Sequence, residues 1–364
     1  MINIASPVIE DEERRAVNEV IESGMLAQGP KVAELEKNWA EYCGVKHALA
    51  VNSGTAAIHC ALYAAGVKAG DEVITTPYSF IATINPILML GAHPVLVDID
   101  KETFNIDVSK IEAAITKKTK AIIPVDLYGQ PCDWAELQEI AKKHDLKIIE
   151  DACQAIGAEY KGTKAGALGD FGCFSLYATK NIMCGEGGIV TTNSDEAAAA
   201  IRSFRQHGMV APYEYADLGY NYRMSDLHGS IAVEQLKKVA SFTKKRQENA
   251  RKLDRALMNI QGITIPTISN NRTHVYHQYT ILLGKGIKRD EFIADLREKG
   301  VGAGIYYPKP LHMYPHIAKL GYKVGDFPVA EDLAARVVSL PVHPKVTDED
   351  IEVIAAAVKE SING

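Results

Sequence analysis

The chain has 364 residues, of which 47% are hydrophobic and 24% are charged, a composition typical of a soluble globular protein with a large core. Its formal charge of -6 at pH 7 gives no general attraction to nucleic acid or to an anionic membrane, so neither is predicted as a partner. No run approaches the roughly 18 consecutive apolar residues of a membrane-spanning helix, and the first residues lack the basic and apolar regions of a signal peptide. We therefore expect a cytoplasmic protein.

The elements predicted for the first part of the chain alternate between strands and helices. Helical patterns cover 55–65, which is followed by Gly66, and 133–144. Short apolar runs predict strands at 47–51, 72–75, 94–98, 121–125, 147–150, 171–176 and 188–192. This alternation predicts an α/β fold with a mostly parallel sheet covered by helices on both faces.

The pattern changes near residue 225. One long helix is predicted over about 226–259. A strand at 279–283, a helix at 289–299, a strand at 304–307 and a last helix at 348–361 are predicted after it. We therefore predict a large domain, residues 1–240, and a smaller C-terminal α+β domain, residues 241–364, joined by the long helix.

The first segment with a chemical signal is N-S-G-T, residues 52–55, between a predicted strand and a predicted helix. A glycine there exposes backbone amides at the positive end of the helix, which suits a phosphate. The same residue types suit an ordinary Ser/Thr helix cap, and both interpretations stay open. The lysine that a P-loop requires does not follow, so a P-loop is excluded.

The second segment ends at Asp151, just past an apolar strand and so at the carboxyl edge where parallel sheets bind ligands. An acid there suits a protonated pyridine nitrogen, but it would also suit the cap of a following helix, and the residues alone favour neither. Gln154, three residues further on, would share a helical face with Asp151 and reach the same ligand.

The third segment carries Lys180, which follows a strand ending near Ser175 and precedes the turn G-E-G-G, residues 185–188. Most lysines are simply exposed to water. Apolar flanks on both sides predict a partly desolvated amine, and desolvation lowers the pKa of a lysine and makes it nucleophilic, as Schiff-base chemistry requires. A fourth segment, G-Y-N-Y-R-M at 219–224, gathers aromatic, amide and guanidinium groups without indicating a use.

In this order, N-S-G-T, E-D-A-x-Q, S-x-x-x-T-K-N with G-E-G-G, and G-Y-N-Y-R-M resemble the motifs of the DegT-type sugar aminotransferases. That family belongs to the aspartate-aminotransferase superfamily, fold type I of the pyridoxal-phosphate enzymes, and the similarity runs from Gly29 to Pro341. The resemblance implies transfer of an amino group, with glutamate as the expected donor, to a keto sugar nucleotide in amino-sugar or polysaccharide biosynthesis. The stretch T-K-N-x-x-x-G-E-G-G is more similar to branches acting at the fourth carbon of the sugar than at the third.

The resemblance also implies roles for single residues. Lys180 would hold pyridoxal 5'-phosphate as a Schiff base and move the proton between substrate carbon and cofactor. Asp151 would keep the pyridine nitrogen protonated, and Gln154 would bind the phenolic oxygen of the ring. Phe80 would stack on the ring face, with plain core packing as its alternative.

Further contacts are implied around the phosphate and the substrate. Gly54, Thr55 and Ser175 would hold the phosphate, and Asn221 would reach it from a second subunit, which implies a homodimer with shared active sites. The implied substrate contacts are Lys31, Arg223, Tyr306 and His312. His312 and His316 stand four apart without an acidic or cysteine partner nearby, so no metal site is predicted.

Two other functions stay open. The first is a pyridoxal-phosphate lyase acting on a small amino acid, and the second is a cofactor-bound sensor or regulator. Family members that act as dehydratases carry histidine at the position of Lys180, so that variant is not predicted. Turnover of a keto sugar nucleotide with glutamate would separate the three functions.

Overall fold

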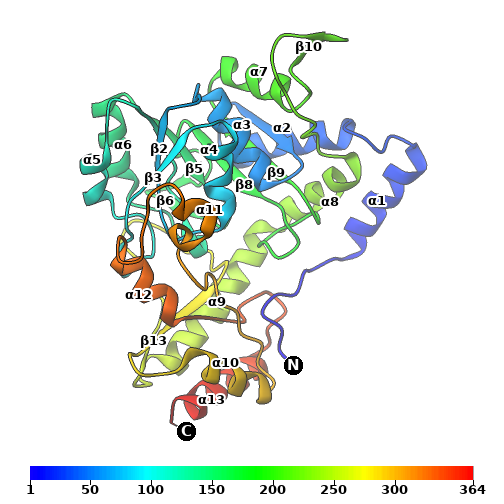
Figure 1. Ribbon diagram of the computed structural model, residues 1–364. Coiled ribbons are helices and arrows are strands. Elements are labelled where there is room, and N and C mark those ends of the chain that lie inside the picture. Colours follow the sequence, from blue (N-terminus) through cyan, green and yellow to red (C-terminus); the bar gives the residue numbers. More distant parts are fainter. Residues whose placement is uncertain (364) are drawn as a thin grey trace.

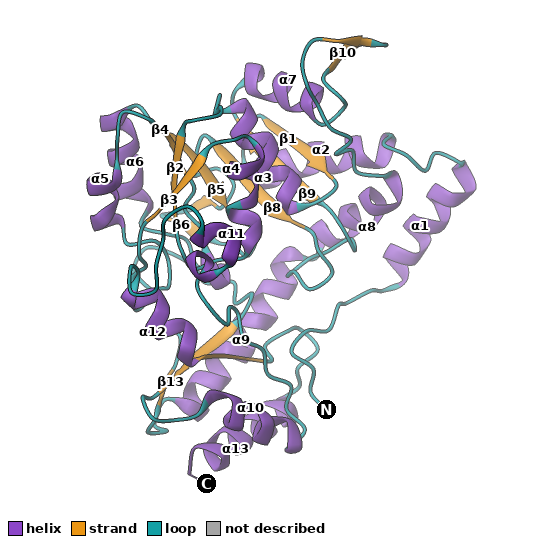
Figure 2. Ribbon diagram, viewed as in Figure 1, coloured by secondary structure: helices purple, strands orange, loops and turns teal. Residues whose placement is uncertain are grey.

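The computed structural model describes residues 1–363, and its larger unit is built on a seven-stranded sheet in the order β1-β9-β8-β5-β4-β2-β3 (Figures 1 and 2). The strands are β1 (His47–Val51), β2 (Glu72–Thr75), β3 (His93–Leu96), β4 (Thr119–Ile122), β5 (Lys147–Asp151), β8 (Phe171–Ser175) and β9 (Gly188–Thr192). β9 runs antiparallel to both of its neighbours, whereas the other pairs are parallel. The predicted strands and the mostly parallel sheet are therefore confirmed.

Helices cover both faces of this sheet because alternate strand residues point to opposite sides. In β1, Ala48 and Ala50 pack toward α2 (Pro30–Cys43) and α8 (Asp226–Lys237). Leu49 and Val51 pack on the other face, toward α3 (Gly54–Ala64), α4 (Asn85–Met89) and α7 (Asp195–Phe204). The first face is continued by α5 (Ile111–Ala114) and α6 (Trp134–His144), which cover β2, β4 and β5. The apolar runs of the strands are thus buried on both sides.

The C-terminal unit is a small antiparallel sheet with helices packed on it. Its strands are β12 (Ile263–Thr264), β13 (Tyr279–Leu283) and β14 (Val337–Leu340), and its core includes residues of α9 (Val239–Leu257), α10 (Arg289–Glu298) and α13 (Asp348–Asn363). Residues from α11 (Pro315–Ala318) and α12 (Pro328–Arg336) pack with Tyr78 and Tyr128 of the larger unit. We propose the domain boundary near residue 240, with one exception: Ile2 pairs with Val301 of the C-terminal unit.

Two elements differ from the prediction. The single helix expected over 226–259 is two helices, α8 and α9, separated at Lys238. The Lys238 amine binds Glu10 and Glu13 beside α1 (Asp11–Ser23), a tertiary contact that a helical sequence pattern cannot reveal. The strand expected at 304–307 is absent from the described chain, because only Gly304 pairs, with Ser339.

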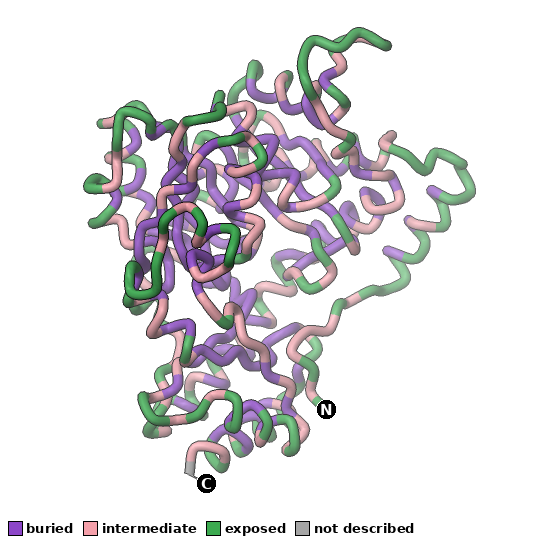
Figure 3. Tube along the Cα trace, viewed as in Figure 1, coloured by how far each residue is buried: buried purple, intermediate pink, exposed green. Residues whose placement is uncertain are grey.

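Short elements complete the chain. A hairpin of β10 (Met209–Ala211) and β11 (Glu214–Tyr215) projects from the larger unit and is mostly exposed, as is much of α1, while the sheet itself is buried (Figures 1 and 3). β6 (Glu159–Tyr160) pairs with β7 (Thr163–Lys164), and the short helices are η1 (Ile81–Thr83), η2 (Val108–Lys110), η3 (Leu127–Gly129) and η4 (Leu311–Met313). Across residues 1–363, no helix is both long enough and apolar enough to cross a membrane.

Candidate active site

A cavity of about 480 Å³ lies at the carboxyl ends of β5 and β8. These strands are neighbours and parallel, so the residues at their ends meet at one edge of the sheet. The C-terminal unit supplies further wall residues, including His277 and Tyr307. The predicted site residues in its lining are Gly54, Thr55, Phe80, Asp151, Gln154, Ser175, Lys180 and Tyr306.

One end of the cavity is formed by the start of α3. The Ser53 hydroxyl accepts a hydrogen bond from the N–H of Ala56 at 3.1 Å, so the helix-cap interpretation is correct for this residue. The N–H groups of Gly54 and Thr55 have no partner among the described residues and lie beside Ser175 at the cavity wall. A Cβ atom at Gly54 would lie 2.9 Å from Cβ of Ser175, so only glycine allows this approach. This end of the cavity is therefore suited to an anion.

Lys180 is held by a loop that folds back on the end of β8. The N–H of Leu176 donates to the carbonyl of Gly187 at 2.8 Å, and Gly185 adopts a φ of +93° that favours glycine. The side chain of Lys180 is half-buried, and within residues 1–363 its amine has no ion pair and no hydrogen bond. Burial lowers the pKa of Lys180, although Cys153 and Asp151 nearby oppose the shift. The expected desolvated amine is thus present in the structure.

Asp151 faces this lysine from the end of β5. Its carboxylate accepts hydrogen bonds from the hydroxyl of Thr83 at 2.8 Å and from the N–H of Cys153 at 3.2 Å. The chain after Asp151 forms turns rather than a helix, so Asp151 caps no helix and the helical face expected to join it to Gln154 is wrong. Both side chains nevertheless reach the cavity, because the turns bring Gln154 back toward it.

Aromatic residues form the opposite wall. Phe80 is 55% exposed, so the core-packing interpretation is wrong for this residue, and its ring centroid lies 6.0 Å from that of Tyr307. Gln154 accepts from the N–H of Tyr128 at 2.9 Å and donates to the hydroxyl of Tyr307 at 3.2 Å. The Tyr306 carbonyl accepts from the hydroxyl of Tyr78 at 3.0 Å. This wall is fixed from both structural units, and the exposed ring of Phe80 is open to a ligand.

The single chain does not bring four predicted residues to the cavity. Lys31 lies at the start of α2, where its amine is 3.5 Å from Glu34, and His312 is buried with Nε2 2.9 Å from the Glu331 carboxylate. His312 therefore has a structural environment instead of the expected place in the substrate site. Asn221 and Arg223 lie in the segment beside the end of β1, outside the cavity.

Other cavity residues were not anticipated. Thr83, Cys153, His277 and Gln278 also line it, and of these only Cys153 lies within a motif that the sequence displays. Thr83 and His277 are far from the motifs along the chain and reach the site only through folding. The sole available signal for Cys153 was its place inside E-D-A-x-Q, between Asp151 and Gln154.

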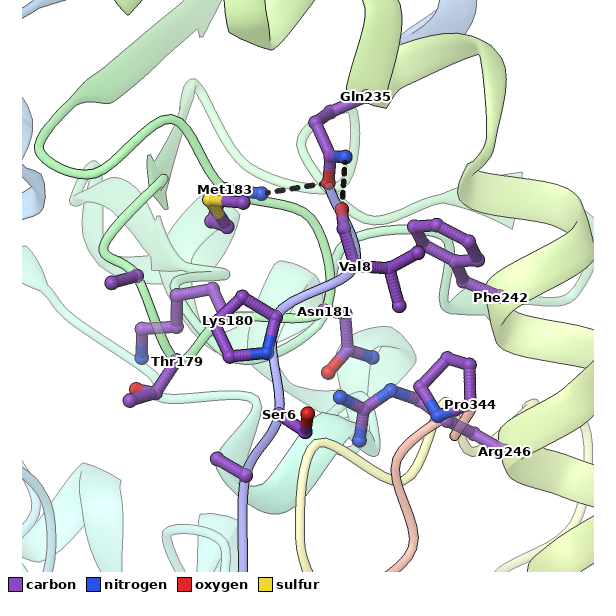
Figure 4. A pocket seen from close by; sticks show the side chains of 13 residues that line it. Ser6, Val8, Thr179, Lys180, Asn181, Met183, Gln235, Phe242, Arg246 and Pro344 are labelled. Atoms are coloured by element: carbon purple, nitrogen blue, oxygen red, sulfur yellow. Dashed lines mark hydrogen bonds between the residues drawn. The ribbon is translucent and has the colours of Figure 1, made fainter. Parts of the chain in front are cut away.

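A second, smaller cavity of about 20 Å³ lies on another side of Lys180 (Figure 4). Its walls come from the N-terminal segment, including Ser6 and Val8, and from Asn181 and Arg246. Figure 4 shows the guanidinium of Arg246 beside the amide of Asn181, with the amine of Lys180 pointing away from Arg246. Lys180 is thus packed from several segments that are remote from one another in the sequence.

Comparisons with known proteins identify the family of this chain. The chain matches the model of the DegT/DnrJ/EryC1/StrS aminotransferase family over residues 7–359. It is similar to the GDP-perosamine synthase of Caulobacter vibrioides, with 40% identity covering 99% of this chain and 98% of the relative. It is also similar to a pleiotropic regulatory protein of Geobacillus stearothermophilus, with 43% identity covering 97% and 95%.

Among solved structures, the fold is similar to the PLP form of the putative sugar aminotransferase Spr1654 from Streptococcus pneumoniae. The TM-score is 0.94 at 29% identity, and the match covers 100% of this chain and 98% of that one. The expected fold type I is thereby confirmed. The chain therefore belongs to the DegT/DnrJ/EryC1/StrS family and is a sugar aminotransferase by family and by fold.

Proposed function

We propose that this protein is a pyridoxal-phosphate-dependent aminotransferase that moves an amino group from glutamate to a keto sugar nucleotide. The observation that carries the proposal is Lys180: a half-buried amine with a lowered pKa, without a partner in residues 1–363, in a cavity that also holds the carboxylate of Asp151. A buried cation without a counter-ion costs free energy. A protein retains such a group where its amine has a chemical use.

The residues present fit pyridoxal phosphate. The free N–H groups of Gly54 and Thr55 and the hydroxyl of Ser175 form a cradle that a Cβ atom at position 54 would fill, which suits the phosphate. The exposed ring of Phe80 suits the flat face of a pyridine, and Asp151 suits its protonated nitrogen. When bound through Lys180, the cofactor supplies an electron sink for the amino carbon.

Asp151 and Lys180 would have separate roles in proton transfer. Asp151, fixed by Thr83 and Cys153, would hold a proton on the ring nitrogen. Lys180, when its amine is free, would take a proton from the substrate carbon and pass it to the cofactor. Its lowered pKa favours this role because a neutral amine can accept a proton.

The substrate is proposed as a 4-keto sugar nucleotide in polysaccharide biosynthesis. The T-K-N-x-x-x-G-E-G-G stretch supports the fourth carbon, and a relative that is named a GDP-perosamine synthase supports a sugar nucleotide. The cavity is about 480 Å³, enough for a cofactor with part of a substrate beside it. Turnover of purified protein with glutamate and a panel of 3-keto and 4-keto sugar nucleotides tests this assignment, and exclusive use of 3-keto sugars would contradict it.

The covalent link is tested separately. Borohydride reduction of the protein with pyridoxal phosphate, followed by peptide mapping, should place the label on Lys180. Lys161 and Lys164 lie in the β6–β7 hairpin and are the internal controls, because neither lines the cavity. Label on another lysine, or no label at all, would overturn the proposal.

We further propose a homodimer in which Asn221 and Arg223 serve the partner's site, since their own chain leaves them outside the cavity. Lys180→Ala and Asn221→Ala variants should each be weak, but a mixed dimer collects both substitutions in one site and neither in the other. Re-annealed mixtures at limiting cofactor should therefore recover activity. Proven heterodimers without recovery would show that Asn221 acts elsewhere.

A regulatory role is the second candidate, because one relative is named a pleiotropic regulatory protein. Cofactor binding at Lys180 without turnover of any keto sugar nucleotide would favour it.

A further inference from the structure

His277 lies at the wall of the larger cavity, in the segment before β13 that comes from the C-terminal unit. The ring is buried, and its Nδ1 lies 3.2 Å from Oδ1 of Asn181. No part of the proposed mechanism has yet used this pair. Asn181 directly follows Lys180, so the contact joins His277 to the segment that carries the reactive amine.

The hydrogen bonds of Asn181 determine which nitrogen of His277 carries the proton. The Nδ2 amide of Asn181 donates to the carbonyl of Val275 at 3.0 Å, and a carbonyl can only accept. Oδ1 of Asn181 is therefore the atom that faces His277, and as an acceptor it requires a proton on Nδ1. A neutral ring with its proton on Nδ1 has a lone pair on Nε2.

The surroundings keep this ring neutral. Burial lowers the pKa of His277 well below its ordinary value, and the charges of Lys180 and Arg246 lower it further. Arg246 is itself buried and donates to the carbonyl of Tyr276 at 2.9 Å, which fixes the backbone next to His277. Among the described residues Nε2 has no partner, and it is not one of the fully buried unpaired atoms, so it opens toward the cavity.

We propose that His277 is a positioning residue whose Nε2 accepts a hydrogen bond from the amine of Lys180 when that amine is free. Both side chains line one cavity, and the Lys180 amine makes no hydrogen bond in the described chain. Asn181 sets the tautomer and the C-terminal unit sets the ring's place. The lysine that leaves the cofactor would thereby stay near the reacting carbon instead of swinging into solvent. The inference rests on the proposed function only for the importance of Lys180.

The pair is tested in full-length protein freed of cofactor, so the readout does not depend on transamination. The rate at which acetic anhydride modifies Lys180, followed by mass spectrometry across pH, gives the midpoint of its titration. An acceptor favours the ammonium form, so His277→Phe should move the midpoint down by about one pH unit. The other titratable or charged groups near the pair are Asp151, Cys153, Tyr177, Glu186, Arg246, Tyr306 and Tyr307.

Two further variants separate positioning from simple structural support. A glutamine at 277 places an amide oxygen near the position of Nε2 and should keep the midpoint within about 0.3 pH units. In His277→Asn the shorter side chain reaches Asn181 but not Lys180, so the titration midpoint of Lys180 should fall as it does in His277→Phe. His274→Gln is the matched control, because His274 is also a buried histidine but does not line the cavity. An unchanged midpoint in His277→Phe, or equal shifts for glutamine and phenylalanine, would overturn the proposal.

The tautomer has its own test. In protein labelled with ¹⁵N-histidine, the His277 signals, assigned by their loss in His277→Gln, should show a protonated Nδ1 and an unprotonated Nε2. A proton on Nε2 would overturn the acceptor role whatever the labelling shows. If borohydride places no label on Lys180 while both of these tests succeed, the proposed function fails and the Lys180–His277 contact stands.

Discussion

Lys180 and Lys238 are both largely shielded from water, but the pKa values of their amines are shifted in opposite directions. The amine of Lys238 binds Glu10 at 2.7 Å, Glu13 at 2.8 Å and Glu12 at 3.4 Å. Burial alone would lower the pKa of Lys238, but the hydrogen bonds that its amine donates to Glu10 and Glu13 outweigh burial and raise the pKa. Lys180 has no such partner in the described chain, and burial lowers its pKa.

The different partners of these two amines explain why only Lys180 is suited to act as a nucleophile. Three carboxylates around Lys238 hold its proton and fasten α1 to the junction of α8 and α9. Near Lys180 the carboxylate of Asp151 already accepts hydrogen bonds from Thr83 and Cys153. A lysine amine that is buried without a dedicated counter-ion becomes a better nucleophile. A lysine amine that is buried with one stays charged and holds neighbouring elements together.

The largest effect is expected for Lys180→Ala. Turnover should fall by at least about 10²–10⁴-fold, the usual contribution of a group that moves a proton, because no other lysine lines the cavity. The free energy of unfolding should not fall, since an unpaired half-buried charge is removed. Steady-state kinetics and urea unfolding measure both. Near-normal turnover in this variant would remove Lys180 from the mechanism.

Asp151→Asn should reduce turnover by about 10²–10³-fold, as the loss of a fixed electrostatic partner does in other enzymes. The amide keeps the shape of the carboxylate and can still accept from Thr83, so unfolding should change little. Kinetics of the loaded protein provide the measurement. A variant that works at half the normal rate would show that the charge at 151 has no role.

Lys238→Met should act on stability instead of turnover. It leaves Glu13, which is 1% exposed, without its cation, and the free energy of unfolding should fall by about 3 kcal/mol at pH 7. Turnover at low temperature should stay near normal. Loss of activity in folded Lys238→Met would show that Lys238 affects turnover as well as stability.

The same variant has a predictable pH dependence. Although burial raises it, hydrogen bonds from Lys238 and from the N–H of Glu10 lower the pKa of Glu13 overall. A lowered pKa contributes stability above the unfolded value of about 4.3 that is lost as the pH falls through the folded value. The stability gap between wild type and Lys238→Met should therefore shrink below about pH 4, and a constant gap in urea unfolding at pH 3 and pH 7 would contradict this.

The smallest effect is expected for Thr83→Val, which removes one of the two hydrogen bonds to Asp151. Turnover should fall by about threefold to tenfold, because a hydrogen bond contributes roughly 1 kcal/mol net. Thr83→Ser keeps the hydroxyl and is the matched control. Equal losses in both variants would point to packing around the methyl group as the cause.

Local patterns predicted much of this molecule because the sheet is buried on both faces. Its strands are therefore apolar runs in the sequence. Gly54, Asp151 and Lys180 lie at or shortly after the ends of β1, β5 and β8. The roles of these residues stay predictions, but their meeting in one cavity was foreseeable from the parallel sheet. The family resemblance, which rests on the same short motifs, is confirmed over residues 7–359.

What the sequence did not reveal depends on contacts between distant segments. The break lies at Lys238, whose amine contacts glutamates more than 220 residues earlier in the chain, and the helical sequence pattern continues through it. Thr83 and His277 carry no motif, because a single hydroxyl or imidazole obtains its partner only in three dimensions. His312 shows the converse error: its match to a substrate region did not indicate that Glu331 would bind it in the interior.

The pairing of Ile2 with Val301 has a consequence for the order of events during synthesis. The segment that precedes α1 leaves the ribosome long before the C-terminal unit, yet its pairing partner exists only after that unit has emerged. The small cavity beside Lys180 is lined by residues of this segment, Ser6 and Val8 among them, so the surroundings of Lys180 are completed late. In a nascent chain the motifs around Lys180 would be present before the N-terminal segment encloses this lysine, because contacts between segments so distant in sequence form slowly.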